Sequence, residues 1–332
     1  FFFLIAFLLA ANRNAKPGNI AGVGLTYAAG LLSKSIVFVL PAVLWARDSL
    51  VGTGRSRIQR VSMYGALVAI AAGYLALVWK FVHRAGLGAP VRSLQEQICT
   101  QIKALIFYLK LLVMPTGLSV DHQFLISNSP FDPISAPASL FVLSLVLMAV
   151  RAAGAQPHYL FSLAWFGIIL APSSLIPLNV LVNEHRLYLP SVSFALLAGS
   201  TLGGLPIGSA AMNRFWGATT ILLLCLLGLL TIQRNTVWTS AHALWKDAAS
   251  KAPLMARPHI FLGETHFERG ELNAAREAFE IVLVRDPGFG PAYVRLAEIH
   301  RAQSNAAEAV NVAELGVATM ARNADLWESL GE

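Results

Sequence analysis

The sequence predicts an all-α fold in two parts, a bundle of membrane-spanning helices over residues 1–232 and a helical-repeat α-solenoid over residues 233–332. Charged residues make up only 13% of the chain, whereas a soluble protein carries roughly a quarter. Residues 1–232 hold 15 of the 25 Lys and Arg but 5 of the 18 Asp and Glu, which leaves 10 basic and 13 acidic residues for the rest. Residues of the C-terminal part also recur at a step of 34. The boundary near Gln233 therefore separates a lipid-facing part from a water-facing part.

Seven apolar segments precede this boundary. A membrane span needs about 20 residues, and segments 61–82, 158–176 and 215–232 meet this length alone. Segment 138–151 is short unless Arg151 snorkels at its end. Segment 19–47 is interrupted at Ser33-Lys34, so it is either two short helices or one tilted span. The segments are 1–11, 19–47, 61–82, 138–151, 158–176, 188–206 and 215–232.

The segment 94–113, LQEQICTQIKALIFYLKLLV, is predicted to be an amphipathic helix that lies along the membrane interface. Leu94, Ile98 and Leu105 recur at helical spacing, and Gln101 and Lys103 are polar. Proline 115 follows and ends the helix.

Short loops with Lys and Arg face the cytoplasm in membrane proteins. If segment 19–47 is two short helices and segment 94–113 does not cross, the loops that carry Arg13, the group Arg47–Arg60, Arg151 and Arg214 fall on one face. If segment 19–47 is one tilted span, only the first of these loops changes sides. That face is predicted to be cytoplasmic, and we expect a bacterial inner membrane. The opposite, periplasmic or luminal face then receives Lys34, the 83–137 loop, the 177–187 loop and the repeats. Because much of the positive charge lies in short loops that set the orientation in the membrane, it does not indicate nucleic-acid binding.

The repeats match the tetratricopeptide (TPR) pattern, which has a period of 34 residues. Small residues let two helices approach closely, and a proline ends the second helix of a unit. Upstream, Trp245 and Pro253 match a second helix and its end. The first full unit has His259, Leu262, Gly263, His266, Ala275, Phe279 and Pro287, the next has Tyr293, Leu296, Ala297, His300 and Ala309, and a third opens with Trp327, Leu330 and Gly331.

The segment NEHRLYLP at 183–190 concentrates polar residues between two apolar segments. Arg186 and Tyr188 are suited to bind a lipid-linked phosphate, with Glu184 orienting Arg186. The alternative is an interfacial anchor, because Tyr and Arg are common at headgroup level.

Lys34 is a further candidate for pairing with a phosphate, and its alternative is a snorkelling lysine. Asp121, His122 and His185 are secondary candidates, because ionisable residues near lipid are often functional. The sequence contains no metal-ligand spacing, and we expect neither a metal nor a cofactor.

Three stretches, LLSKSIVFVLP at 31–41, YLKLLVMPTGLSVDHQF at 108–124 and NEHRLYLPSVSF at 183–194, occur in this order before the repeats. Together they resemble the bacterial relatives of the transmembrane and TPR repeat-containing O-mannosyltransferases, of the GT-C superfamily. One departure is Ser35, where relatives often have Glu.

The resemblance implies an enzyme that moves a mannose-like sugar from a polyprenyl phosphate to a protein hydroxyl, with TPRs recruiting the protein or peptide acceptor. It implies lipid-phosphate contacts for Lys34, Glu184, Arg186 and Tyr188. The catalytic acid of the family lies in a first outer loop, so we expect it upstream of Phe1 in a longer protein. The alternative function is a non-enzymatic, membrane-anchored TPR scaffold.

Overall fold

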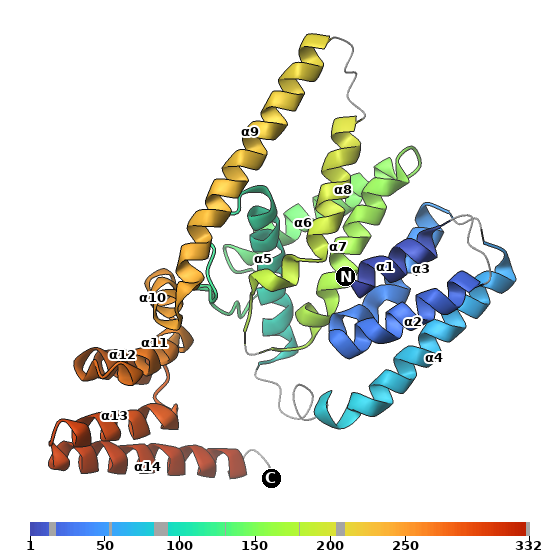
Figure 1. Ribbon diagram of the computed structural model, residues 1–332. Helices are drawn as coiled ribbons and strands as arrows, with labels where there is room; N and C mark the ends of the chain where they lie inside the picture. Colours follow the sequence, from blue (N-terminus) through green and yellow to red (C-terminus); the bar gives the residue numbers. More distant parts are fainter. Residues whose placement is uncertain are drawn as a thin grey trace. The chain divides into compact units, whose positions relative to one another are not determined.

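In the computed structural model, every regular element of the described residues is a helix. The structure describes residues 1–12, 18–52, 55–82, 92–129, 131–178, 180–203 and 210–329, so Arg13 of the predicted topology lies outside them. The chain divides into two compact units (Figure 1). Unit 1 comprises residues 1–115, 125–181 and 185–206, and unit 2 comprises residues 116–124, 182–184 and 207–332.

Unit 1 contains eight of the α-helices, which are α1 (Phe2–Ala11), α2 (Gly18–Ser33), α3 (Leu40–Leu50), α4 (Arg57–Val82), α5 (Leu94–Val113), α6 (Ser135–Ala152), α7 (Pro157–Leu175) and α8 (Pro190–Gly203). The prediction left open whether segment 19–47 is broken. In the structure α2 ends at Ser33, Lys34 is extended, and the short 3-10 helix Ser35–Val39 leads into α3.

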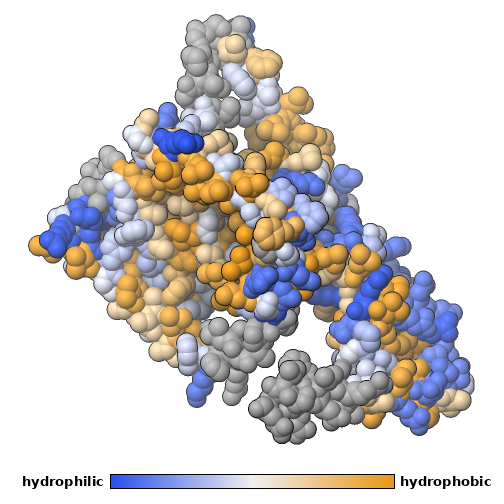
Figure 2. Space-filling model, turned by 180° about the vertical axis from the view of Figure 1, so that it is seen from behind, coloured by the Kyte–Doolittle hydropathy of each residue, from blue (hydrophilic) through white to orange (hydrophobic). Residues whose placement is uncertain are grey.

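Four segments are long and apolar enough to cross a membrane, namely Arg57–Lys80, Ser135–Ala152, Pro157–Leu175 and Arg214–Thr239. They include the three segments that the sequence predicts as full spans, and they add α6, which contains the short segment 138–151. No residue in the most apolar window of Arg214–Thr239 is buried. Figure 2 shows broad hydrophobic areas on the surface. These properties fit an integral membrane protein, because exposed apolar helices of this length are stable in lipid and not in water.

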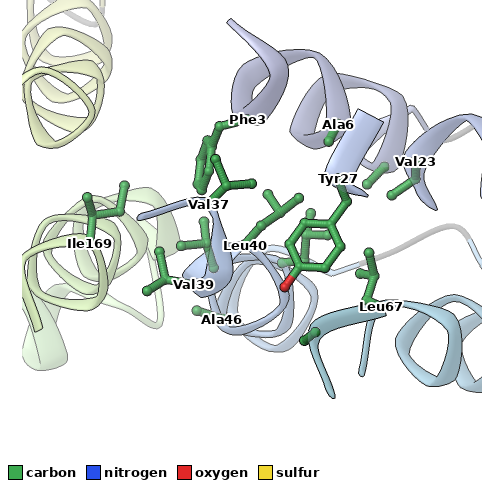
Figure 3. Packing of buried hydrophobic residues seen from close by; sticks show 14 of the residues in the cluster. Phe3, Ala6, Val23, Tyr27, Val37, Val39, Leu40, Ala46, Leu67 and Ile169 are labelled. Carbon is green, nitrogen blue, oxygen red and sulfur yellow. The ribbon is translucent and has the colours of Figure 1, made fainter. Parts of the chain in front are cut away.

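The core of unit 1 lies where α1, α2, α3 and α4 pack together with α7 (Figure 3). Trp165 of α7 is fully buried, and its ring meets those of Phe3 and Phe7 edge-on at centroid distances of 5.6 and 4.8 Å. Aromatic pairs in this geometry contribute about 0.5–1.5 kcal/mol beyond the buried area. This contact fixes α7, and with it the segment that follows α7, against the N-terminal helices.

Unit 2 contains α9 (Ala210–Asn235), the 3-10 helix Thr236–Thr239, α10 (Ala241–Lys251), α11 (Ala256–Glu268), α12 (Leu272–Arg285), α13 (Gly290–Ala302) and α14 (Ala306–Ser329). The starts of α11 and α13 differ by 34 residues (290 − 256), as do those of α12 and α14 (306 − 272). Helix α11 packs on α12, α12 on α13, and α13 on α14.

The expected opening of a third repeat is not seen as a new helix. Helix α14 continues through Trp327 to Ser329, and Leu330 and Gly331 lie outside the described residues. The physical reason is the missing stop signal. Pro253 and Pro287 follow the ends of α10 and α12, whereas Ala321 occupies the equivalent position of α14 and continues the helix.

Candidate functional site

The segment after α7 forms a fixed turn over residues 184–190 in which Tyr188 is presented to the outside. The Arg186 guanidinium donates hydrogen bonds to the carbonyls of Leu181 at 2.9 Å and Val180 at 2.8 Å. On the other side, the Trp165 indole donates to the Leu189 carbonyl at 2.9 Å. Tyr188 is 78% exposed. The turn is therefore held from within while its tyrosine remains available to a ligand.

Helix α5 supports this segment through its polar side chains. The buried Gln97 amide donates to the carbonyls of Ser174 at 2.8 Å and Ile176 at 3.3 Å, where α7 ends and its carbonyls lack helical partners. Gln101, also buried, donates to Leu181 at 3.3 Å.

The expectation of a water-facing polar side on the 94–113 helix is therefore wrong at these positions. Its apolar residues Leu94 and Ile98 are 68% and 46% exposed, while Gln97 and Gln101 are buried and Gln95 remains exposed. The reason is that the glutamines satisfy carbonyls distant in sequence, and an unpaired buried carbonyl costs about 1–3 kcal/mol.

Three cationic side chains of unit 1, Lys34, Arg92 and Arg186, are linked electrostatically around His185: Lys34 and Arg186 both act on His185, and Arg186 also acts on Arg92. Burial lowers the pKa of His185, and the positive charges of Lys34 and Arg186 lower it further. Burial likewise lowers the pKa of Arg92, against the charge of Glu96, and Arg186 adds to the lowering. None of the salt bridges among the described residues includes Lys34 or Arg186. We call Lys34, Arg92 and Arg186, together with the neighbouring His185, the cationic cluster.

Arg92 was not predicted from the sequence, and it contributes an unsatisfied donor. Its guanidinium donates to the Gln97 side chain at 2.7 Å and to the Leu178 carbonyl, but its buried Nε has no hydrogen-bond partner among the described residues. The only local signal is its position directly before Ser93, the N-cap of α5. A buried cationic N–H without an acceptor is costly, and an anion is the ligand that would satisfy it.

Glu184 does not orient Arg186, contrary to the sequence-based expectation. Its carboxylate accepts a hydrogen bond from the Ser119 backbone N–H at 2.6 Å and lies 3.0 Å from the His122 Nε2. These three residues belong to unit 2. The pairing joins segments 62 or more residues apart, which local sequence patterns do not indicate.

Asp121 lies next to this pair in sequence and contacts the repeat-like helices. Its buried carboxylate is 3.5 Å from the guanidinium of Arg257 in α11. Burial raises the pKa of Asp121, and the charges of Arg257 and His122 partly oppose this. Arg257 also lies over the stacked rings of Trp245 and Phe261, 5.8 and 5.7 Å from their centroids.

Two further hydrogen bonds tie the 116–124 segment to the same helices. The Lys251 ammonium donates to the Leu118 carbonyl at 2.8 Å, and the Leu254 N–H donates to the Gln123 side chain at 3.2 Å. Hydrogen bonds and ion pairs therefore join one unit, which consists of segments 116–124 and 182–184, helix α10 and the first turn of α11.

The structure thus divides the predicted site residues between two groups. Lys34, His185 and Arg186 join the cationic cluster in unit 1, beside the exposed Tyr188. Asp121, His122 and Glu184 form an ion network in unit 2. Among the described residues, no group of three or more His, Cys, Asp and Glu side chains could hold a metal ion.

Comparison with known proteins gives no relative for this chain, since no protein-family model, no curated protein and no solved structure matches it.

Proposed function

We propose that this chain carries the donor-binding site of an integral-membrane glycosyltransferase. The enzyme moves a mannose-like sugar from a polyprenyl phosphate to a protein hydroxyl on the periplasmic or luminal face. The cationic cluster is the observation that carries the proposal. It brings the cations Lys34, Arg92 and Arg186 together with His185 near the end of the apolar helix Pro157–Leu175, with the unsatisfied Arg92 Nε among them.

The chemistry of the donor explains why such a cluster is useful. When the bond between the sugar and the phosphate oxygen breaks, negative charge accumulates on the lipid phosphate, which leaves as a phosphate monoester. Fixed cations and N–H donors directed at that phosphate stabilise the transition state. Arg186 and Arg92 are already oriented by backbone carbonyls, so little side-chain freedom is lost when the donor binds. The apolar surface of the adjacent helix offers a place for the polyprenyl chain.

The helical pairs of unit 2 are proposed to be TPR repeats that recruit the acceptor protein. The 34-residue step between helix starts and the packing of successive helices support this assignment. Hydrogen bonds from α10 and the α10–α11 connection to the 116–124 segment support placing the repeats on the same side of the membrane as the loops before α6 and after α7. An acceptor bound by the repeats would then be on the face where the lipid phosphate is bound.

The direct test is sugar transfer from polyprenyl-phosphate mannose by the full-length protein in proteoliposomes. Arg186→Ala and Lys34→Ala are each expected to lower kcat/KM about tenfold to a hundredfold, because a charge-assisted hydrogen bond contributes roughly 1.5–3 kcal/mol. Lys80→Ala is a matched control, since Lys80 is an exposed lysine at the end of α4. Transfer that is equally fast in both site variants would refute the assignment of the donor site.

The second candidate function is a membrane-anchored scaffold, favoured by the directly connected span α9 and helices α10–α14. It predicts that no sugar transfer occurs and that the site variants leave the capture of partner proteins unchanged. The enzyme proposal predicts transfer that depends on Arg186.

A further inference from the structure

An open groove lies between α3 and the first turns of α4, in a part of unit 1 that the proposed transfer reaction does not use. Its volume is about 590 Å³, within the range of about 300–1,000 Å³ found for small-molecule sites. The residues that line it are Trp45, Arg57, Arg60, Val61, Tyr64, Gly65 and Val68.

The groove is polar at one end and apolar along the rest. Arg57 and Arg60 begin the candidate span Arg57–Lys80 and are both exposed. Val61 and Val68 follow on the same helix and are 66% and 61% exposed. Since α4 enters the hydrocarbon region as it proceeds, the two valines lie deeper in the bilayer than the two arginines.

Neither arginine pairs with an acidic side chain in the described part of the chain. Asp48 of α3 is paired with Arg47 at 2.8 Å and accepts a hydrogen bond from the Tyr64 hydroxyl at 3.0 Å. No salt bridge of the described residues includes Arg57 or Arg60. The positive charge at this end of the groove is therefore available to an external anion.

The wall of the groove contributed by α3 is aromatic. Trp45 is 65% exposed, and tryptophan at this depth is typical of the boundary between headgroups and acyl chains. Gly65 leaves space in the middle of the groove, because a Cβ added there would meet no atom within 4 Å.

We infer that this groove binds an anionic phospholipid of the bilayer, with its phosphate on Arg57 and Arg60 and one acyl chain along Val61, Gly65 and Val68. Basic pockets between membrane helices recognise anionic headgroups in this way. The combination of unpaired cations, an interfacial aromatic residue and an apolar groove in the order of bilayer depth selects a lipid over a soluble anion. The site is separate from the cationic cluster, so it stands or falls independently of sugar transfer.

The test is a titration of the detergent-solubilised chain with phosphatidylglycerol, read by native mass spectrometry. Arg57→Ala/Arg60→Ala is expected to weaken binding about 30-fold, since each basic residue near an anionic membrane surface contributes roughly a factor of five. The matched control is Arg151→Ala/Arg214→Ala, which removes two exposed arginines at the ends of other candidate spans. The control is expected to change the affinity less than threefold.

A second variant tests the apolar part of the site without changing charge. Gly65→Leu places a side chain in the groove and is expected to weaken phosphatidylglycerol binding at least fivefold while both arginines remain. Glycerol phosphate, the headgroup without acyl chains, is expected not to compete at equal concentration. The inference is overturned if the control double variant weakens binding as much as Arg57→Ala/Arg60→Ala, if Gly65→Leu binds like the unaltered chain, or if glycerol phosphate competes fully.

Discussion

Phe279 and Gly263 form a contact whose energy can be worked out from the structure. The Phe279 ring is 1% exposed and lies against Gly263, where an added Cβ would be 3.0 Å from two ring carbons and 3.2 Å from a third. Distances this short require the buried ring to shift. Gly263→Ala should therefore cost about 1–3 kcal/mol through overpacking, against a gain of about 1 kcal/mol in helix propensity, which leaves a net loss of up to about 2 kcal/mol.

Removing the ring reverses the sign of this effect. Phe279→Ala alone should cost about 3–5 kcal/mol, the usual range for a buried phenylalanine. In that background the added Cβ of Gly263→Ala meets no ring, so only the gain in helix propensity of about 1 kcal/mol remains. The same substitution is thus expected to destabilise the unaltered chain and to stabilise the Phe279→Ala chain.

Hydrogen–deuterium exchange of the α11 and α12 amides in the detergent-solubilised chain measures both effects. A tenfold faster exchange corresponds to about 1.4 kcal/mol of lost local stability. Gly217→Ala in α9 is the control, since an added Cβ there meets nothing within 4 Å, and it should leave this exchange unchanged. If Gly263→Ala has the same sign in both backgrounds, the close contact of α11 with α12 is not as described.

Three further results are expected. Gln97→Ala should lower the free energy of unfolding by about 1–3 kcal/mol, because it leaves the carbonyls of Ser174 and Ile176 without this donor. An unchanged thermal unfolding temperature in the variant would show that these hydrogen bonds do not stabilise the fold. Cys225 is exposed on α9, and in proteoliposomes the bilayer should cover it. It should therefore resist a membrane-impermeant maleimide in intact vesicles and react only after solubilisation in denaturant. Labelling in intact vesicles would place α9 outside the membrane. Burial raises the pKa of Asp121, so the folded chain binds the proton of this carboxyl group more tightly than the unfolded chain does. The stability that this tighter proton binding contributes is fully present below pH 3.8 and is lost as the pH rises through the folded-state pKa of Asp121. Asp121→Asn should therefore gain stability relative to the unaltered chain as the pH rises from 3 to 7, measured by thermal unfolding, and an opposite trend would refute the effect of burial.

Much of the helical framework could be predicted because it depends on local patterns. The 94–113 segment coincides with α5, which begins at a capping box of Ser93 and Glu96 and is followed by Pro115. The break at Lys34 was one of two alternatives, and the local sequence did not decide between them. The broken segment packs on a distant part of the chain, since α3 and the 3-10 helix Ser35–Val39 both contact α7.

The partners within the candidate site could not be predicted, because they lie far apart in the chain. Glu184 was assigned to its neighbour Arg186 on the basis of proximity in sequence, whereas its partner His122 is 62 residues away. The inward orientation of Gln97 has the same origin, since its acceptors at the end of α7 are 77 and 79 residues distant. Arg92 lacks any motif, and only the folded arrangement connects its charge to that of Arg186.

Photo-crosslinking of a polyprenyl phosphate tests the central claim most directly. A probe with the photoreactive group close to its phosphate is bound to the chain in proteoliposomes, and the labelled peptides are identified by mass spectrometry. The account predicts labelling of the turn that carries Arg186 and Tyr188 and of the segment around Lys34, and a strong loss of labelling in Arg186→Ala. Labelling that is confined to other segments, or that persists unchanged in Arg186→Ala, would contradict a lipid-phosphate site at the cationic cluster.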